Sequence, residues 1–218
     1  MTWDWTFAWE ILPRLLDGLL VTVEITVAGS AIALVLGLLI AVVRRSRVPL
    51  VSPLFGGLVH FVRGTPLLVQ AFFFFYVFPS YGITLPTLTT GIIAIGVHYS
   101  AYTAEVYRAG IENVPRGQWE AARALSLPLR RQWMGIVLPQ AIRAVIPAQG
   151  NYIIAMFKDS AILSAITVTE LLNKAQAVGS DSFRYLEPLT LAGLLYLLVS
   201  YPAAKLIRRL EHRLAYER

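Results

Sequence analysis

Long apolar runs separated by short polar segments dominate the chain. The run Ile25–Val43 holds nineteen residues without a charge, close to the roughly 20 that a helix needs to cross about 30 Å of hydrocarbon. No charge occurs between Leu67 and Ala104, a stretch too long for one helix, so the proline and glycine residues at 79–86 predict a hairpin there. The pattern therefore predicts five membrane-spanning helices, at residues 15–43, 54–78, 86–109, 138–164 and 188–206.

Composition supports a membrane protein. Hydrophobic residues make up 56% of the 218 residues and charged residues only 15%, against about 25% charged residues in globular domains. We expect an all-α integral membrane protein whose single transmembrane domain covers residues 1–218. The chain has no cysteine, which excludes disulfides, cysteine nucleophiles and thiolate metal sites. The first fourteen residues include Asp4 and Glu10 and lack a basic segment, so no cleavable signal peptide is expected.

Basic residues predict the orientation in the membrane. They gather after the first, third and fifth runs: Arg44, Arg45 and Arg47; Arg108, Arg116, Arg123, Arg130 and Arg131; and Lys205, Arg208, Arg209 and Arg213. The turn at 79–86 has no Lys or Arg, and the loop at 167–187 has only Lys174 and Arg184. Because cytoplasmic loops carry the excess of basic residues, the N-terminus is expected outside and the C-terminus in the cytoplasm. The net charge of +6 is attributed to this orientation, and nucleic acid is not an expected partner.

A polar, arginine-rich segment at about 113–131 interrupts the apolar runs. Pro115 suits the first turn of a helix, and Pro128 is expected to end that helix after about ten residues. The small side chains of Ala121 and Ala124 lie near one face of the expected helix. Such a face allows close docking to a partner in the aqueous phase, and an amphipathic helix lying on lipid headgroups is the alternative.

The spacing within this segment resembles the coupling loop of ATP-binding-cassette importer permeases. That loop reads E-A-A, three residues, G, nine residues and I-x-L-P, and the pattern is met from Glu120 to Pro139 except that Ser126 replaces the glycine. The resemblance implies a coupling helix that docks on an ATPase subunit and transmits its closure to the membrane helices. The positions that it marks for ATPase coupling are Glu120, Ala121, Ala122, Arg123 and Ser126.

Three further segments resemble the polar amino acid uptake permeases. They are Arg63–Gln70, which reads RGTPLLVQ, Ala101–Ile111, which reads AYTAEVYRAGI, and Phe157–Leu163, in which Ala161 replaces a small hydroxyl residue. The resemblance implies a permease subunit of an amino acid importer, with the five-span core of a type I importer, in the bacterial inner membrane. It implies as partners two ATPase subunits, a second permease subunit that is identical or homologous, and an extracytoplasmic amino-acid-binding protein.

Polar side chains inside or beside the apolar runs are candidate functional groups, because a charge in hydrocarbon is costly. The candidates for a substrate path or gate are Arg63, Gln70, Glu105, Lys158, Asp159 and Ser160. Lys158 and Asp159 are hypothesised to contact the zwitterionic head of an amino acid or to line the outer gate, and an interfacial pair that reaches the lipid headgroups is the alternative. Arg63 precedes a predicted helix break at Gly64–Pro66, where transporters place substrate or gate elements. Glu105 also suits a local ion pair with Arg108.

The third run also predicts a packing surface. Gly91, Ala94, Gly96 and Ala101 are expected to give a face on which another helix packs closely. His98 lies in the same run and, like His60, has no metal-ligand spacing to other histidines or acids, so a packing role and no metal site are expected.

Other functions stay open at this point. A permease for another small solute, such as methionine or a sugar, is the nearest alternative, and the RGTPLLVQ segment argues against it. An intramembrane enzyme needs a nucleophile–base or metal cluster, and no such spacing of Ser, His and Asp is evident. A membrane scaffold that binds lipid through the arginine-rich loop is a third possibility. The sequence has no G-x-x-x-x-G-K-[ST], so ATP, magnesium and hydrolysis are expected in the ATPase partners and no cofactor is expected on this chain.

Overall fold

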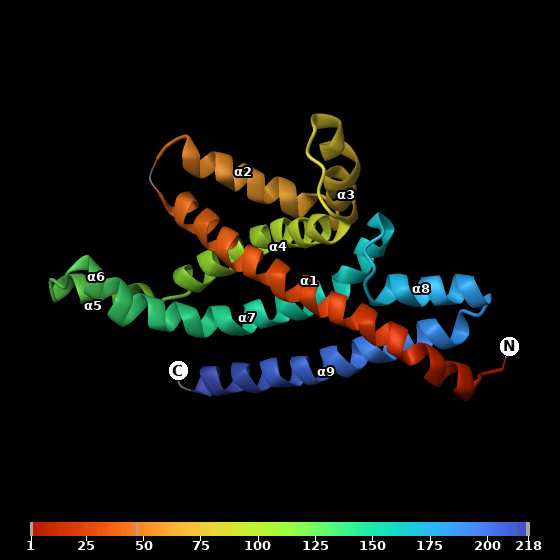
Figure 1. Ribbon diagram of the computed structural model, residues 1–218. Helices are drawn as coiled ribbons and strands as arrows, with labels where there is room; N and C mark the ends of the chain where they lie inside the picture. Colours follow the sequence, from red (N-terminus) through yellow and green to blue (C-terminus); the bar gives the residue numbers. More distant parts are fainter. Residues whose placement is uncertain (1, 47, 217–218) are drawn as a thin grey trace.

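The computed structural model describes residues 2–46 and 48–216, in which all regular secondary structure is helical. The α-helices are α1 (Trp5–Arg45), α2 (Val51–Gly64), α3 (Leu67–Phe72), α4 (Thr87–Glu112), α5 (Arg116–Ala124), α6 (Leu129–Arg131), α7 (Leu138–Asp159), α8 (Leu171–Ser182) and α9 (Leu186–Tyr216). Short π-helical or 3-10 segments occupy Phe73–Val77, Phe78–Tyr81, Gln132–Val137 and Ser160–Ile166. In Figure 1, α1 runs diagonally past α4 and α7, with α9 below; the N-terminus and α8 lie at one end and α5, α6 and the C-terminus at the other.

Helix α1 begins at Trp5, well before the predicted span, and its 41 residues correspond to about 60 Å. Asp4 caps it by accepting hydrogen bonds from the backbone N–H groups of Thr6, at 2.9 Å, and Phe7, at 3.2 Å. Arg184 donates to Asp4 and to Glu187, which joins the start of α1 to the α8–α9 connection. The bond from the Phe7 N–H and the nearby guanidinium lower the pKa of the Asp4 carboxyl.

Helix α4 lies at the centre of the packing. Ile95 on α4 joins a buried apolar cluster with Ile25 and Ala33 on α1 and Met156 on α7. Toward one end of α4, the Thr103 hydroxyl donates to the side chain of Gln149 on α7 at 3.2 Å. Protein therefore covers much of the surface that a lone membrane helix would expose to lipid.

Hydropathy alone marks only some of the predicted spans. Within the described residues, α1 and α9 are long and apolar enough to cross a membrane, and up to four spans are counted if each of two bent helix pairs forms one. Helix α4 has 26 residues, or about 39 Å, but is too polar to meet this criterion. Five of its polar or tyrosine side chains, Thr90, His98, Tyr99, Ser100 and Thr103, are buried, so α4 need not be as apolar as a helix that faces lipid.

The predicted second span is not one straight helix. Residues 51–64 and 67–81 meet at an angle of 103°, so the segment predicted to cross at 54–78 is a bent pair of helices, and the predicted break after Arg63 is confirmed. Pro66 has no N–H to donate, which frees carbonyl groups of the preceding turn. The Thr65 hydroxyl donates to the Phe61 carbonyl at 3.1 Å, and Gln70 Nε2 donates to the Val62 carbonyl at 2.8 Å. These side chains stabilise the break by pairing the freed carbonyls.

The segment 167–187, predicted as a loop, contains α8. Glu170 caps α8 by accepting from the backbone N–H groups of Leu172, at 2.8 Å, and Asn173, at 2.7 Å. The Glu170 side chain is fully buried and also accepts a hydrogen bond from the Tyr196 hydroxyl at 2.8 Å. Leu171, Ala175 and Val178 pack one face of α8 against α1 and α9, which gives this short helix the tertiary support that its length requires.

Glycines allow α1 and α4 to approach closely, as the small residues of the third run predicted. A Cβ at Gly96 would lie 2.8 Å from Cβ of Ile32, and a Cβ at Gly37 would lie 2.9 Å from the carbonyl oxygen of Ser100. Real Cβ atoms essentially never approach a neighbour this closely, so a side chain at either position would push the helices apart.

We expect Gly37→Ala to destabilise the protein by about 1–3 kcal/mol, because the added methyl group overpacks the α1–α4 contact. Gly57→Ala is the matched control: a Cβ at Gly57 meets no atom within 4 Å, and alanine favours the helix. Thermal unfolding of the purified protein in detergent measures both variants. Equal midpoints would contradict the close α1–α4 contact.

Candidate functional site

Helix α5 occupies the segment that the sequence marked for coupling. It covers Arg116–Ala124, with Pro115 as N-cap and Leu125 as C-cap. Glu120, Ala121, Arg123 and Ser126 are exposed, as a docking role requires. Ala122 is not: its side chain is 2% exposed, so in this chain it packs α5 against the neighbouring helices. The helix also ends before Pro128, which instead precedes α6 as its N-cap.

The turn after α5 explains why the motif has a glycine at the position of Ser126. The backbone N–H of Ser126 donates to the Arg123 carbonyl at 2.9 Å, and that of Leu127 donates to the Ala122 carbonyl at 3.1 Å. This pair of bonds is a Schellman motif, which places one residue in the left-handed region. Ser126 is that residue, with φ of +50°. Serine therefore forms the same turn at a conformational cost that glycine avoids.

Aromatic contacts hold α5 against the rest of the chain. The rings of Trp119 on α5 and Trp133 lie 5.3 Å apart between centroids, and both belong to an apolar cluster around Val114, Val137 and Ala141. The Arg45 guanidinium lies 4.8 Å from the Trp133 ring centroid. Helix α5 is thus attached to the ends of α1 and α4 and to the start of α7.

The opposite side of α5 is exposed in the described part of the chain. We call the surface formed by Glu120, Ala121, Arg123, Leu125 and Leu129 the α5 outer face. Leu125 is 72% exposed and Leu129 is 73% exposed. Two large exposed apolar side chains among charged groups are typical of a protein interface.

A second polar region surrounds the middle of α4. We call it the α4 polar cluster; its members are Arg63, Gln70, His98, Tyr99, Tyr102, Tyr152 and Asp159. The Tyr99 hydroxyl donates to Asp159 Oδ2 at 2.6 Å, and His98 Nδ1 lies 3.2 Å from Gln70 Oε1. The Arg63 guanidinium lies 5.1 Å from the centroid of the Tyr102 ring, and the Tyr152 ring is 5.7 Å from that of Tyr102. The cluster therefore combines a cation, an anion and aromatic rings that contact one another in tilted or edge-to-face geometry.

The structure brings together three of the six predicted path residues. Arg63, Gln70 and Asp159 meet in the α4 polar cluster, although they come from three different helical segments. Lys158 is exposed and makes no ion pair with Asp159. Ser160 is buried, and its hydroxyl donates to the Phe157 carbonyl at 2.8 Å.

Glu105 lies outside the α4 polar cluster. It accepts hydrogen bonds from Arg108 on the same helix, at 2.7 Å and 2.9 Å, and from Arg44 at the end of α1. The local pair with Arg108 that the sequence allowed is therefore present, and the contact with Arg44 adds a link between α1 and α4. This arrangement favours a structural role for Glu105.

The aromatic members of the cluster were missed from the sequence. His98 was expected to serve packing, and Tyr99, Tyr102 and Tyr152 were not singled out. A sequence signal existed, because His98 and Tyr102 stand four residues apart and so share one face of α4. Among the described residues, no group of three or more His, Asp or Glu side chains is placed to hold a metal ion.

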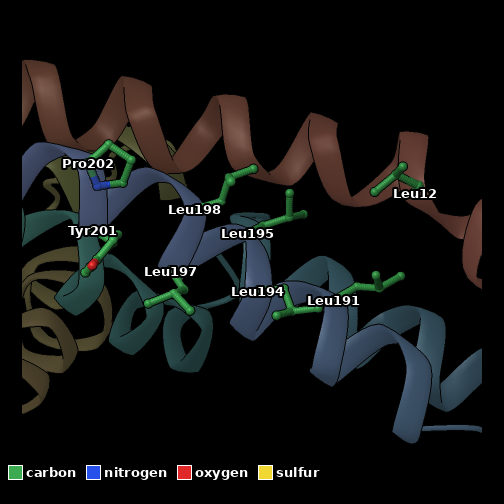
Figure 2. Close-up of a pocket in the computed structure, with 8 residues that line it drawn as sticks. All are labelled: Leu12, Leu191, Leu194, Leu195, Leu197, Leu198, Tyr201 and Pro202. Carbon is green, nitrogen blue, oxygen red and sulfur yellow. The ribbon is translucent and has the colours of Figure 1, made fainter.

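A separate apolar groove lies between α1 and α9 (Figure 2). Its volume is about 440 Å³, and it is lined by six leucines together with Tyr201 and Pro202. No charged side chain is among these lining residues, so the groove has no charge that could orient an amino acid and instead suits contact with lipid chains.

Comparison with known proteins identifies the family. The model of the "Binding-protein-dependent transport system inner membrane component" family matches residues 33–216. The chain belongs to this family. It is 45% identical over 212 residues to the probable amino-acid ABC transporter permease protein y4tG of Sinorhizobium fredii (strain NBRC 101917 / NGR234), covering 95% of this chain and 92% of that protein. It is 34% identical over 208 residues to the L-cystine transport system permease protein TcyB of Bacillus subtilis (strain 168), covering 93% of this chain and 89% of that protein.

A solved structure agrees with this membership. A chain from a crystal structure described as an amino acid ABC transporter with histidines superposes with a TM-score of 0.93 and is 34% identical, covering 98% of this chain and 100% of that chain. The fold is therefore the all-helical type I ABC permease fold. The chain is a membrane-embedded transport subunit of the inner membrane and not an enzyme, and hydrolysis occurs in the ATPase partner.

The Schellman turn generates a prediction about Ser126. Ser126→Gly is expected to stabilise the end of α5 by about 1 kcal/mol, because glycine adopts positive φ without steric cost. Ser126→Val is expected to act in the opposite direction, since a β-branched residue is an outlier there. Amide hydrogen exchange over residues 116–127 measures both effects.

Ser200→Gly in the interior of α9 is the control, and there glycine is expected to destabilise the helix. Faster exchange in Ser126→Gly than in the unmodified protein would show that the turn is not strained.

Proposed function

We propose that the chain is the permease subunit of an ATP-driven importer for polar amino acids. The observation that carries this proposal is the α4 polar cluster, in which Arg63 contacts the ring of Tyr102 and Asp159 accepts a hydrogen bond from the neighbouring Tyr99. Its relatives, an amino-acid permease and an L-cystine permease, support the same substrate class.

The cluster suits a zwitterion. The Asp159 carboxylate complements the ammonium group of an amino acid, and the Arg63 guanidinium complements its carboxylate by paired hydrogen bonds. The faces of Tyr99 and Tyr102 also attract a cation. Lys158, which is exposed beside this region, is proposed as a member of the outer gate. Gln70 is proposed to stabilise the helix break that follows Arg63 by its hydrogen bond to the Val62 carbonyl.

The proposed topology has five crossings, made by α1, the bent α2–α3 pair, α4, α7 and α9. The N-terminus is proposed outside and the C-terminus in the cytoplasm. Support comes from the positive-inside rule and from Figure 1, in which α5, α6 and the end of α9 lie at the end of the molecule opposite the N-terminus.

The proposed assembly contains two copies of an ATPase subunit, a second permease subunit, and an extracytoplasmic amino-acid-binding protein. Each ATPase is proposed to bind ATP with magnesium and to dock on one α5 outer face. The exposed leucines of this face fit a groove with an apolar floor. The arginines of α5 and α6 fit acidic groups on the rim of that groove, and Glu120 fits a basic group there.

The docking proposal is tested by reversing one charge on the α5 outer face. Glu120→Arg is expected to reduce co-purification of the ATPase with this chain at least about tenfold, because it places a like charge against the basic side of the interface. Glu10→Arg on the far end of α1 is the matched control and should retain the ATPase. Equal retention by both variants would rule out docking through this face.

The substrate proposal is tested by removing the anion of the α4 polar cluster. Asp159→Asn preserves the side-chain shape, and uptake of the imported amino acid into proteoliposomes should fall at least about tenfold while the complex still assembles. Asp181→Asn is the control, because its side chain is 66% exposed on α8. Normal uptake by the Asp159 variant would remove Asp159 from the path.

A further inference from the structure

An apolar cavity lies where the cytoplasmic ends of α1 and α4 meet the start of α7. Its volume is about 660 Å³, within the roughly 300–1,000 Å³ of ligand sites. Leu38 and Val42 on α1, Ile111 on α4, and Ile142 and Val145 on α7 form its walls. Such walls suit a hydrocarbon chain and offer little to a polar solute.

One end of this cavity is polar. Arg45 is the last residue of α1 and Ser46 is its C-cap, and both line the cavity. Among the described residues, no carboxylate pairs with Arg45, whereas its neighbour Arg44 is paired with Glu105. The Ser46 hydroxyl is buried and has no hydrogen-bond partner in the described part of the chain, a state that costs free energy until an acceptor or donor arrives.

The surroundings of Arg45 leave it able to bind an anion. Its guanidinium Cζ lies 4.8 Å from the Trp133 ring centroid and 5.8 Å from that of Trp119. Such cation–π contacts do not neutralise the guanidinium charge, which can therefore attract a phosphate. Leu38 stands seven residues before Arg45, which is about 10 Å along the helix. The cavity thus runs from the headgroup level into the hydrocarbon.

We propose that this cavity binds one anionic phospholipid of the inner leaflet. The phosphate accepts hydrogen bonds from Arg45 and Ser46, and an acyl chain lies along Leu38, Val42 and Ile142. The groove of Figure 2 lacks a cation among its lining residues and does not share this role. Because Arg45 also contacts Trp119 of α5, the bound lipid holds the coupling helix to the end of α1.

The lipid site is tested on the delipidated complex of this chain with its ATPase. Phosphatidylglycerol or phosphatidylcholine is added, and native mass spectrometry counts the lipid retained. Phosphatidylglycerol should be retained about tenfold better than phosphatidylcholine, and Arg45→Gln should remove this preference. Arg209→Gln, which removes the same charge from the exposed surface of α9, should leave the preference intact.

The acyl chain is tested separately from the charge. Val42→Trp fills the cavity, and retention of phosphatidylglycerol should fall while the unfolding temperature stays unchanged. Val35→Trp is the matched control, because Val35 lies on the same helix with 63% exposure against 61% for Val42, but does not line the cavity. If Val42→Trp retains phosphatidylglycerol fully, the cavity does not hold the acyl chain of the lipid.

Two other results overturn the proposal. Equal losses in Arg45→Gln and Arg209→Gln would show diffuse attraction of anionic lipid and no defined site. The chain has no native cysteine, so a disulfide between two copies of Val42→Cys would show that a second copy covers this face. The Glu120→Arg variant separates the lipid site from the proposed function. If this variant loses the ATPase but still retains phosphatidylglycerol, lipid binding does not depend on ATPase docking.

Discussion

The packing of α4 between α1 and α7 is the contact on which the rest of the structure depends. Helix α4 carries histidine, tyrosine and hydroxyl side chains at membrane depth, and in hydrocarbon such groups need protein partners. Glycines at positions 37 and 96 bring α1 close enough to cover one side of α4. The polar side chains that α1 does not cover gather beside α7 as the α4 polar cluster.

The same packing connects the α4 polar cluster to α5. Helix α4 leads into α5 at Asn113, and α7 follows α5 through α6 and a π-helical segment. Tyr102 and Asp159 therefore lie on two helices that both join the segment holding α5. Trp119 and Trp133 pack α5 against those helix ends, so a force on α5 would be transmitted to both helices of the cluster, as the proposed docking of the ATPase requires. In this arrangement α5 acts as a rigid element whose movement would shift α4 and α7 together.

The sequence predicted the helical membrane fold, the position of α5 and the break after Arg63, because these depend on long apolar runs, proline and local spacing. It did not predict that Ala122 faces inward, because the rotation of α5 is decided by Trp119 and Trp133. Helix α8 was missed, since Glu170 acts as a cap only with buried support from Tyr196. The tyrosines of the α4 polar cluster were missed because their meeting depends on tertiary packing.

Cysteine accessibility tests the central claim most directly, because the chain has no native cysteine. Single cysteines are placed at Tyr102, in the α4 polar cluster, and at Ala104, which is fully buried on α4, and are treated with a membrane-impermeant maleimide in the assembled transporter. We predict labelling at position 102 that changes when ATP is added, and no labelling at position 104 in either state. Labelling at 104 and protection at 102 would show that α4 presents the opposite face to water.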